Sequence, residues 1–198
     1  MIPEYFAYLT IILGLVGAIY YIKNILYGTT RPNLVSWVLW TIAPFVGVYI
    51  AYQSGVSGPI LLYTFMAGFS PLLVVIASLF KKGSYWKTTR FDIVCGALSL
   101  LAIIVWIVTK NGILSLLFAI IADLMAGIPT LVKSWRHADT EHIAPYGLGI
   151  INQIITFLII KEVTFLNFAF PVYFILSNLV IIFEVKRKYL SNVFKFRN

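Results

Sequence analysis

The chain has 198 residues, of which 61% are hydrophobic and 11% are charged, with a mean hydropathy of +0.93. A soluble domain of this size still exposes roughly 30% of the surface of its unfolded chain, and this sequence has too few polar side chains to cover it. The composition therefore excludes a soluble globular protein and predicts a membrane protein.

The net charge of +8 does not indicate a nucleic-acid partner, because the basic residues lie in short gaps between apolar segments. The single cysteine, Cys95, lies inside an apolar segment and can form no intramolecular disulfide. The first apolar segment carries Glu4, lacks a basic start and has no small-residue cleavage site. We therefore expect it to be retained as a helix.

A helix needs about 20 apolar residues to cross the hydrocarbon, since each residue rises about 1.5 Å and every amide must be bonded internally. Seven segments meet this requirement, which predicts an all-α polytopic membrane protein. In chain order they are Tyr5 to Leu26, Asn33 to Tyr52, Gly58 to Phe80, Phe91 to Thr109, Gly112 to Val132, Ile143 to Ile160 and Phe165 to Val185.

The basic residues predict an orientation, because lysine and arginine are retained on the cytoplasmic side. With the N-terminus outside and the C-terminus in the cytoplasm of a cell-membrane protein, the outside segments hold only Lys110 and Lys161. The other thirteen of the fifteen lie inside: Lys23, Arg31, Lys81, Lys82, Lys87, Arg90, Lys133, Arg136, Lys186, Arg187, Lys188, Lys195 and Arg197.

The hydropathy order repeats, since segments one to three and five to seven share an apolar helix, a basic loop, a second helix, a short turn and a third helix. Two parallel copies of a three-helix unit need one extra crossing between them. We therefore expect a bundle over residues 1–83, a linker helix within 84–110 and a second bundle over 111–198.

The second copy carries Ile-Pro-Thr-Leu-Val-Lys-Ser-Trp-Arg over 128–136, then Asp-Thr-Glu-His-Ile-Ala-Pro-Tyr over 139–146. This pattern resembles the PQ-loop of the SWEET or MtN3/saliva superfamily of seven-helix transporters, which are built as three plus one plus three helices. The resemblance implies sugar transport and hinges at Pro129 and Pro145. The first copy departs from it, because Ile19-Tyr20 occupies the place of Pro129-Thr130, and Pro44 lies several residues deeper than Pro145.

Asp123 lies near the middle of the fifth segment. A carboxylate at this depth costs about 2.5 to 3.5 kcal/mol on insertion scales, so such groups usually face the bundle interior and mark a pathway. It could bind solute hydroxyls or take up a proton. A protonated, hydrogen-bonded structural aspartate is the alternative.

Trp37, Trp40, Thr41 and Pro44 share one face of the second segment because they recur at spacings of three and four. We expect Trp37 to be an interfacial anchor, and the deeper Trp40 to form a pocket wall with Pro44 and Asp123. Stacking of Trp40 on a ring of the solute is the chemistry this predicts.

Further polar residues in the apolar segments complete the candidate substrate site: Tyr63, Asn152, Gln153, Tyr173 and Asn178. Amides can both donate to and accept from a polar solute, or they can hold transmembrane helices together. Tyr63 and Tyr173 occupy matching positions of the repeat and are expected to face each other, or to serve packing alone.

Four potential metal ligands lie in one loop, at His137, Asp139, Glu141 and His142. Nothing in the sequence fixes their geometry, and Thr140 and Glu141 in a solvated loop at a helix start explain the same residues. No P-loop, dinucleotide fingerprint or HExxH motif is present, so no cofactor, metal or catalytic site is predicted.

The sequence thus predicts a transporter of a small neutral polar solute, a facilitator or proton-assisted, that alternates access by rocking one bundle against the other around Pro44, Pro129 and Pro145. Membrane lipid is the other expected partner, and the sequence leaves a homo-oligomer open. A receptor or scaffold that binds without transport is the alternative, and an enzyme using the loop from His137 to His142 is a third.

Overall fold

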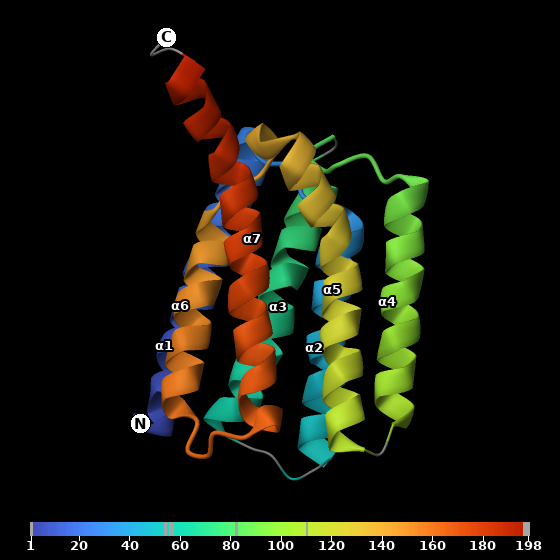
Figure 1. Ribbon diagram of the computed structural model, residues 1–198, viewed down its shortest axis with the longest axis vertical. Helices are drawn as coiled ribbons and strands as arrows, with labels where there is room; N and C mark the ends of the chain where they lie inside the picture. Colours follow the sequence, from blue (N-terminus) through green and yellow to red (C-terminus); the bar gives the residue numbers. More distant parts are fainter. Residues whose placement is uncertain (1, 54, 56–57, 82, 110, 196–198) are drawn as a thin grey trace.

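The computed structural model describes residues 2–53, 55, 58–81, 83–109 and 111–195. Within these ranges all regular structure is helical, which confirms the predicted class (Figure 1). The elements are η1 (Glu4–Phe6), α1 (Ala7–Tyr27), α2 (Leu34–Gln53), α3 (Pro59–Phe80), α4 (Arg90–Val108), α5 (Gly112–Arg136), η2 (Ala138–Thr140), α6 (Ala144–Ile159) and α7 (Phe165–Lys195).

Each α-helix overlaps one predicted segment, but two helices run further than predicted. Helix α5 ends at Arg136 instead of Val132, because its last turn is held by buried contacts of Lys133 and Ser134. Helix α7 continues from Val185 to Lys195, since this stretch contains neither glycine nor proline to end it. Of the predicted basic residues, Lys82, Lys110 and Arg197 lie outside the described residues.

Six described helices are long and apolar enough to cross a membrane, and α6 is apolar but shorter, with 16 residues. The chain is therefore organised as a polytopic membrane protein. The N-terminus lies at one end of the long axis and the C-terminus at the other (Figure 1).

The distribution of side chains is that of a protein surrounded by lipid. Large apolar residues recur along the outer faces, as at Ile12, Val16 and Ile19 of α1, each at least half exposed. Many polar side chains are instead buried, including Lys133 and Glu141. An apolar outer face is unfavourable in water and favourable in contact with lipid hydrocarbon, and the polar side chains lie inside the bundle.

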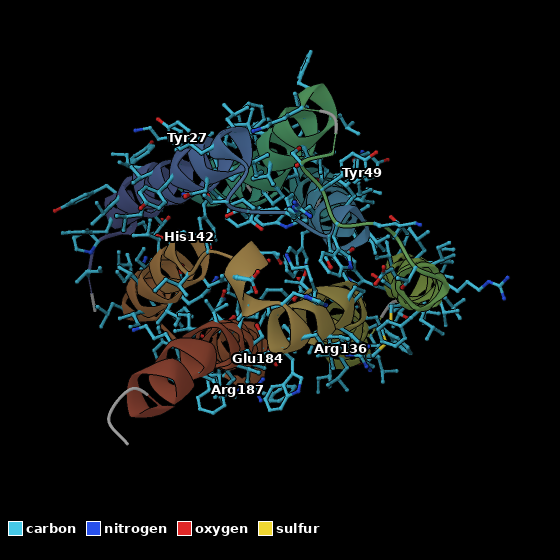
Figure 2. The ribbon with its side chains drawn as sticks, turned by 90° about the horizontal axis from the view of Figure 1, so that it is seen from above. Tyr27, Tyr49, Arg136, His142, Glu184 and Arg187 are labelled. Atoms are coloured by element: carbon cyan, nitrogen blue, oxygen red, sulfur yellow. The ribbon has the colours of Figure 1, made fainter. Side chains whose placement is uncertain are left out.

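Six helices form a ring in the order α1, α3, α2, α5, α7, α6 and back to α1, as their contacts and the view along the bundle show (Figure 2). Helix α3 packs between α1 and α2, and α7 packs between α5 and α6. Helix α4 stands outside the ring, against α2 and α5. We call the two ends of the ring the Glu4 end and the Glu141 end, after the carboxylate each holds.

Helix α4 begins with a hydrogen-bonded N-terminal cap and packs closely against α2. Thr89 accepts a bond from the backbone of Asp92 while the Asp92 carboxylate accepts one from the backbone of Thr89, which is a complete capping box. A methyl group on Gly96 would lie 2.9 Å from Cγ1 of Val35 on α2. Only glycine therefore lets these two helices approach so closely.

Candidate functional site

A cavity of about 550 Å³ lies inside the ring, and all six ring helices contribute to its wall. Eight of the ten residues predicted as site or hinge residues line it: Trp40, Pro44, Tyr63, Asp123, Pro145, Asn152, Gln153 and Asn178. Tyr173 and Pro129 are not in the wall. We refer to this space as the central cavity.

Asp123 is the only charged side chain among the described residues that line the central cavity. Its Oδ2 accepts a hydrogen bond of 2.7 Å from the hydroxyl of Tyr173, so Tyr173 belongs to the site through Asp123. One carboxylate oxygen therefore has a fixed partner in α7. The lining includes no lysine, arginine or histidine, so a large anion would meet no basic group there.

Trp40 lies against α5 close to Asp123. A methyl group on Gly127 would be 3.5 Å from Cζ2 of the Trp40 ring, and Gly127 is one helical turn, about 6 Å, from Asp123. The buried indole N–H of Trp40 has no hydrogen-bond partner within the described residues. The aromatic face and the carboxylate predicted to act together thus share one stretch of wall.

Trp37 differs from the prediction of an interfacial anchor. Its side chain is buried, and its ring lies 4.7 Å from that of Tyr21 and 5.5 Å from that of Trp40, between centroids. The prediction was wrong because Trp37 shares the inward face of α2 with Trp40, and this face packs on α1 and α3. Trp37 therefore belongs to the closed part of the bundle.

The amides of the site have different partners. Gln153 of α6 donates a 3.2 Å bond to the hydroxyl of Tyr63 on α3, which links two helices across the cavity. Asn178 donates to the carbonyl of Phe174 in its own helix. The buried Oδ1 of Asn152 has no partner among the described residues. Tyr63 and Tyr173 thus each bond to another candidate residue, Gln153 and Asp123 respectively.

Prolines interrupt four of the ring helices. Pro44 lies inside α2 and Pro129 inside α5, where each removes one backbone hydrogen bond. Pro145 lies in the first turn of α6, where a missing amide costs no intrahelical bond. Pro71 of α3 and Pro171 of α7 also interrupt their helices and line the central cavity. The sequence analysis missed both, although each is visible as a proline within an apolar segment.

A second cavity, also of about 550 Å³, lies at the Glu4 end and adjoins the central cavity, since the two share the wall residues Thr10, Tyr63, Thr64 and Thr156. Its rim carries the exposed ion pair between Glu4 and Lys161, with an N–O distance of 2.8 Å. The hydrogen bond and the charge of Glu4 raise the pKa of Lys161.

The Glu141 end is closed by a buried cluster that sequence reasoning missed. Lys133 Nζ lies 2.5 Å from Glu141 Oε2, and both side chains are buried. Tyr21 of α1 donates a 2.5 Å bond to Oε1 of Glu141, and Lys133 donates a 2.7 Å bond to the carbonyl of Arg31. The backbone of Arg31 also donates to the carbonyl of Thr140. We call Tyr21, Lys133 and Glu141 the buried lock.

The expectation of a solvated loop was therefore wrong for Glu141, because its carboxylate is buried against Tyr21 and Lys133, whereas His137 and Asp139 of the same loop are exposed. Among the described residues no three His, Cys, Asp or Glu side chains gather as metal ligands would. His137 packs against Trp86 and His142 against Tyr20, with ring centroids 4.8 Å apart in both pairs. Burial lowers the pKa of His142.

Comparison with known protein families, with curated proteins and with solved structures finds no match to this chain.

Proposed function

We propose that the protein is a membrane transporter, a facilitator or proton-assisted, that carries a small neutral polar solute through the central cavity by alternating access. One observation carries this proposal: a cavity of solute size adjoins a second cavity at one end of the helix ring and is separated from the other end by the buried lock. A transporter resting with one side open has this form.

The chemistry of the wall supports a neutral polar solute, and sugar is the expectation from the resemblance to the SWEET and PQ-loop group. Trp40 offers an aromatic face, while Asn152, Gln153 and Asn178 offer amide donors and acceptors. Asp123 is available to accept from hydroxyl groups or to bind a proton.

The helix contacts support an architecture of three plus one plus three. The third helix of each proposed bundle packs between the first two, as α3 does within 1–83 and α7 within 111–198. The linker α4 packs outside. In the proposed orientation the Glu4 end faces outside and the Glu141 end faces the cytoplasm, across the cell membrane.

Uptake into proteoliposomes tests the proposal, with a panel of radiolabelled sugars, amino acids and vitamins. We expect Asp123→Asn and Trp40→Ala each to lower uptake at least tenfold. Asp92→Asn and Trp135→Ala are matched controls, because Asp92 caps α4 and Trp135 packs with Arg187 outside the cavity. These controls should retain uptake.

Unchanged uptake in both site variants would contradict the proposed site. Absence of uptake for the whole panel, together with binding of a panel member to the purified protein, would favour a receptor or scaffold in place of a transporter.

A further inference from the structure

Five polar atoms near the Glu141 end are buried and have no hydrogen-bond partner within the described residues. They belong to side chains that are at most 1% exposed, namely Thr30, Asn33, Ser36, Thr130 and Ser134. We call these five residues the polar seam. Buried polar groups are nearly always bonded to protein or to ordered water, so this concentration needs an explanation.

The polar seam lies where α2 and the connection before it face α5. Trp40 of α2 packs against Gly127 of α5, and Ser36 lies one turn before Trp40 on the same face. On α5, Thr130 and Ser134 follow Gly127 on the buried face, next to Lys133, which reaches the carbonyl of Arg31. The seam therefore runs from the wall of the central cavity to the buried lock.

Buried serine and threonine hydroxyls elsewhere in the described chain are bonded. Thr10, Thr41, Ser78 and Ser99 each donate to a backbone carbonyl, at distances between 2.6 and 2.9 Å. These four residues are at most 8% exposed, and Ser78 and Ser99 are as buried as the seam residues. Burial alone thus does not leave a serine or threonine hydroxyl unpaired among the described residues, and the unpaired ones gather at the α2–α5 interface.

The other interface between the two halves of the ring is packed differently. Gly17 of α1 lies so close to α6 that an added methyl group would be 3.3 Å from Cδ1 of Leu148 and 3.4 Å from Cα of Pro145. This contact is tight and apolar. Of the two interfaces, α2–α5 therefore has more buried polar side chains that gain partners when the helices separate and water or a polar solute enters.

Resting on the transport function proposed above, we propose that the solute leaves the central cavity between α2 and α5, along the polar seam, when the ion pair of Lys133 with Glu141 separates. Lys133 and Glu141 then act as the latch of this exit. The seam residues line the path and offer hydroxyl and amide groups to the solute and to the water that follows it. Tyr21 holds the Glu141 carboxylate in the latched position.

Single cysteines test this path, and the chain suits the method because Cys95 is its only cysteine. In a Cys95→Ala background, Ser36→Cys, Thr130→Cys and Ser134→Cys probe the seam. Ser78→Cys and Ser99→Cys are matched controls, since both serines are equally buried but bonded to backbone carbonyls away from the seam. The readout is the rate of modification by a charged, membrane-impermeant methanethiosulfonate in proteoliposomes.

We expect the seam cysteines to react slowly in the parent background and at least tenfold faster when Glu141→Gln is added, while both controls remain unreactive. Tyr21→Phe, which keeps the ion pair, should raise the seam rates about threefold and serves if the Glu141→Gln protein does not fold. Seam cysteines that stay as unreactive as the controls in both backgrounds would overturn the path. An equal increase at seam and control positions would overturn the latch, because it indicates general loosening of the bundle.

This measurement needs no transported solute, so its failure is distinct from failure of the proposed function. Uptake with an unreactive seam would overturn the exit path and leave transport intact. A seam that opens in a protein without uptake would retain the latch and contradict transport.

Discussion

The two ends of the ring each hold a pair of lysine and glutamate, and the pairs differ mainly in their exposure to solvent. Lys133 and Glu141 are 1% and 0% exposed, with 2.5 Å between charged atoms. Lys161 and Glu4 are 73% and 46% exposed, at 2.8 Å. The same chemical contact is thus screened by water at one end and isolated from it at the other.

This difference decides what each pair does for the fold. An exposed ion pair contributes about 0 to 1 kcal/mol, because water and salt screen it. Loss of one partner from a buried pair costs about 3 to 5 kcal/mol, because an uncompensated charge remains inside. The buried pair also receives the hydroxyl of Tyr21 and reaches the carbonyl of Arg31, so it joins both halves of the ring. The exposed pair joins only the start of the chain to the α6–α7 connection.

The largest expected effect follows from breaking the buried pair. Glu141→Leu should lower the free energy of unfolding by about 3 to 5 kcal/mol, because the ammonium of Lys133 is left buried without a counter-charge. Glu4→Leu is the matched control at the other end and should cost at most about 1 kcal/mol. Thermal unfolding in detergent measures both. Equal losses for the two variants would contradict the comparison.

Tyr21→Phe should have the next largest effect. It removes a buried hydrogen bond to a charged group, which contributes about 1.5 to 3 kcal/mol, while the ring and its packing against Trp37 remain. The same unfolding assay applies, and in the Glu141→Leu background the substitution should cost much less. Equal costs in the two backgrounds would show that the hydroxyl does not act through Glu141.

Substitutions at two glycines of α1 test the difference in packing along this helix, which is tight at Gly17 and looser at Gly14. At Gly14 an added methyl group makes ordinary contacts, the nearest at 3.6 Å from Nδ2 of Asn152, so Gly14→Ala should be neutral or stabilise the helix by up to about 1 kcal/mol. At Gly17 it crowds Pro145 and Leu148. Gly17→Ala should be less stable than Gly14→Ala by about 1 kcal/mol. The reverse order of melting temperatures would contradict the packing described for the two positions.

The smallest effect concerns His142, which lies beside the lock. Burial lowers its pKa in the folded protein, so the unfolded chain binds the proton more readily. Its contribution is therefore fully present above the unfolded pKa of about 6.5, and stability falls as the pH drops below that value. Replacement by glutamine should flatten the dependence of the melting temperature on pH between pH 7 and 5. An unchanged slope would show that other groups cause it.

The sequence predicted the seven helices well because each apolar segment is bounded by its own local signals, such as Thr89 with Asp92 at the start of α4 and Gly28 after α1. It also selected residues that line one cavity, since Asp123, Asn152 and Gln153 are polar groups in segments that otherwise read as apolar. These features depend on composition and on spacing along one helix.

The buried lock could not be predicted in the same way. Lys133 followed the pattern of a cytoplasmic anchor, and Glu141 followed the pattern of a helix start. Their burial depends on Tyr21 and Arg31, which are more than a hundred residues away and belong to the other half of the ring. The prediction for Trp37 was wrong for a related reason. Its burial depends on packing against Tyr21 of α1 and Val74 of α3, which the periodicity of α2 alone does not show.

The short α6 has a consequence for the bilayer around the protein. Its 16 residues rise about 24 Å, whereas the hydrocarbon of a typical bilayer is about 30 Å thick. The adjoining α7 is 31 residues long and has no such deficit. A span this short is accommodated by a locally thinner bilayer or by flanking residues, such as Lys161 in the connection after α6, that extend toward the headgroups. We therefore expect the bilayer to adjust beside α6 more than beside α7.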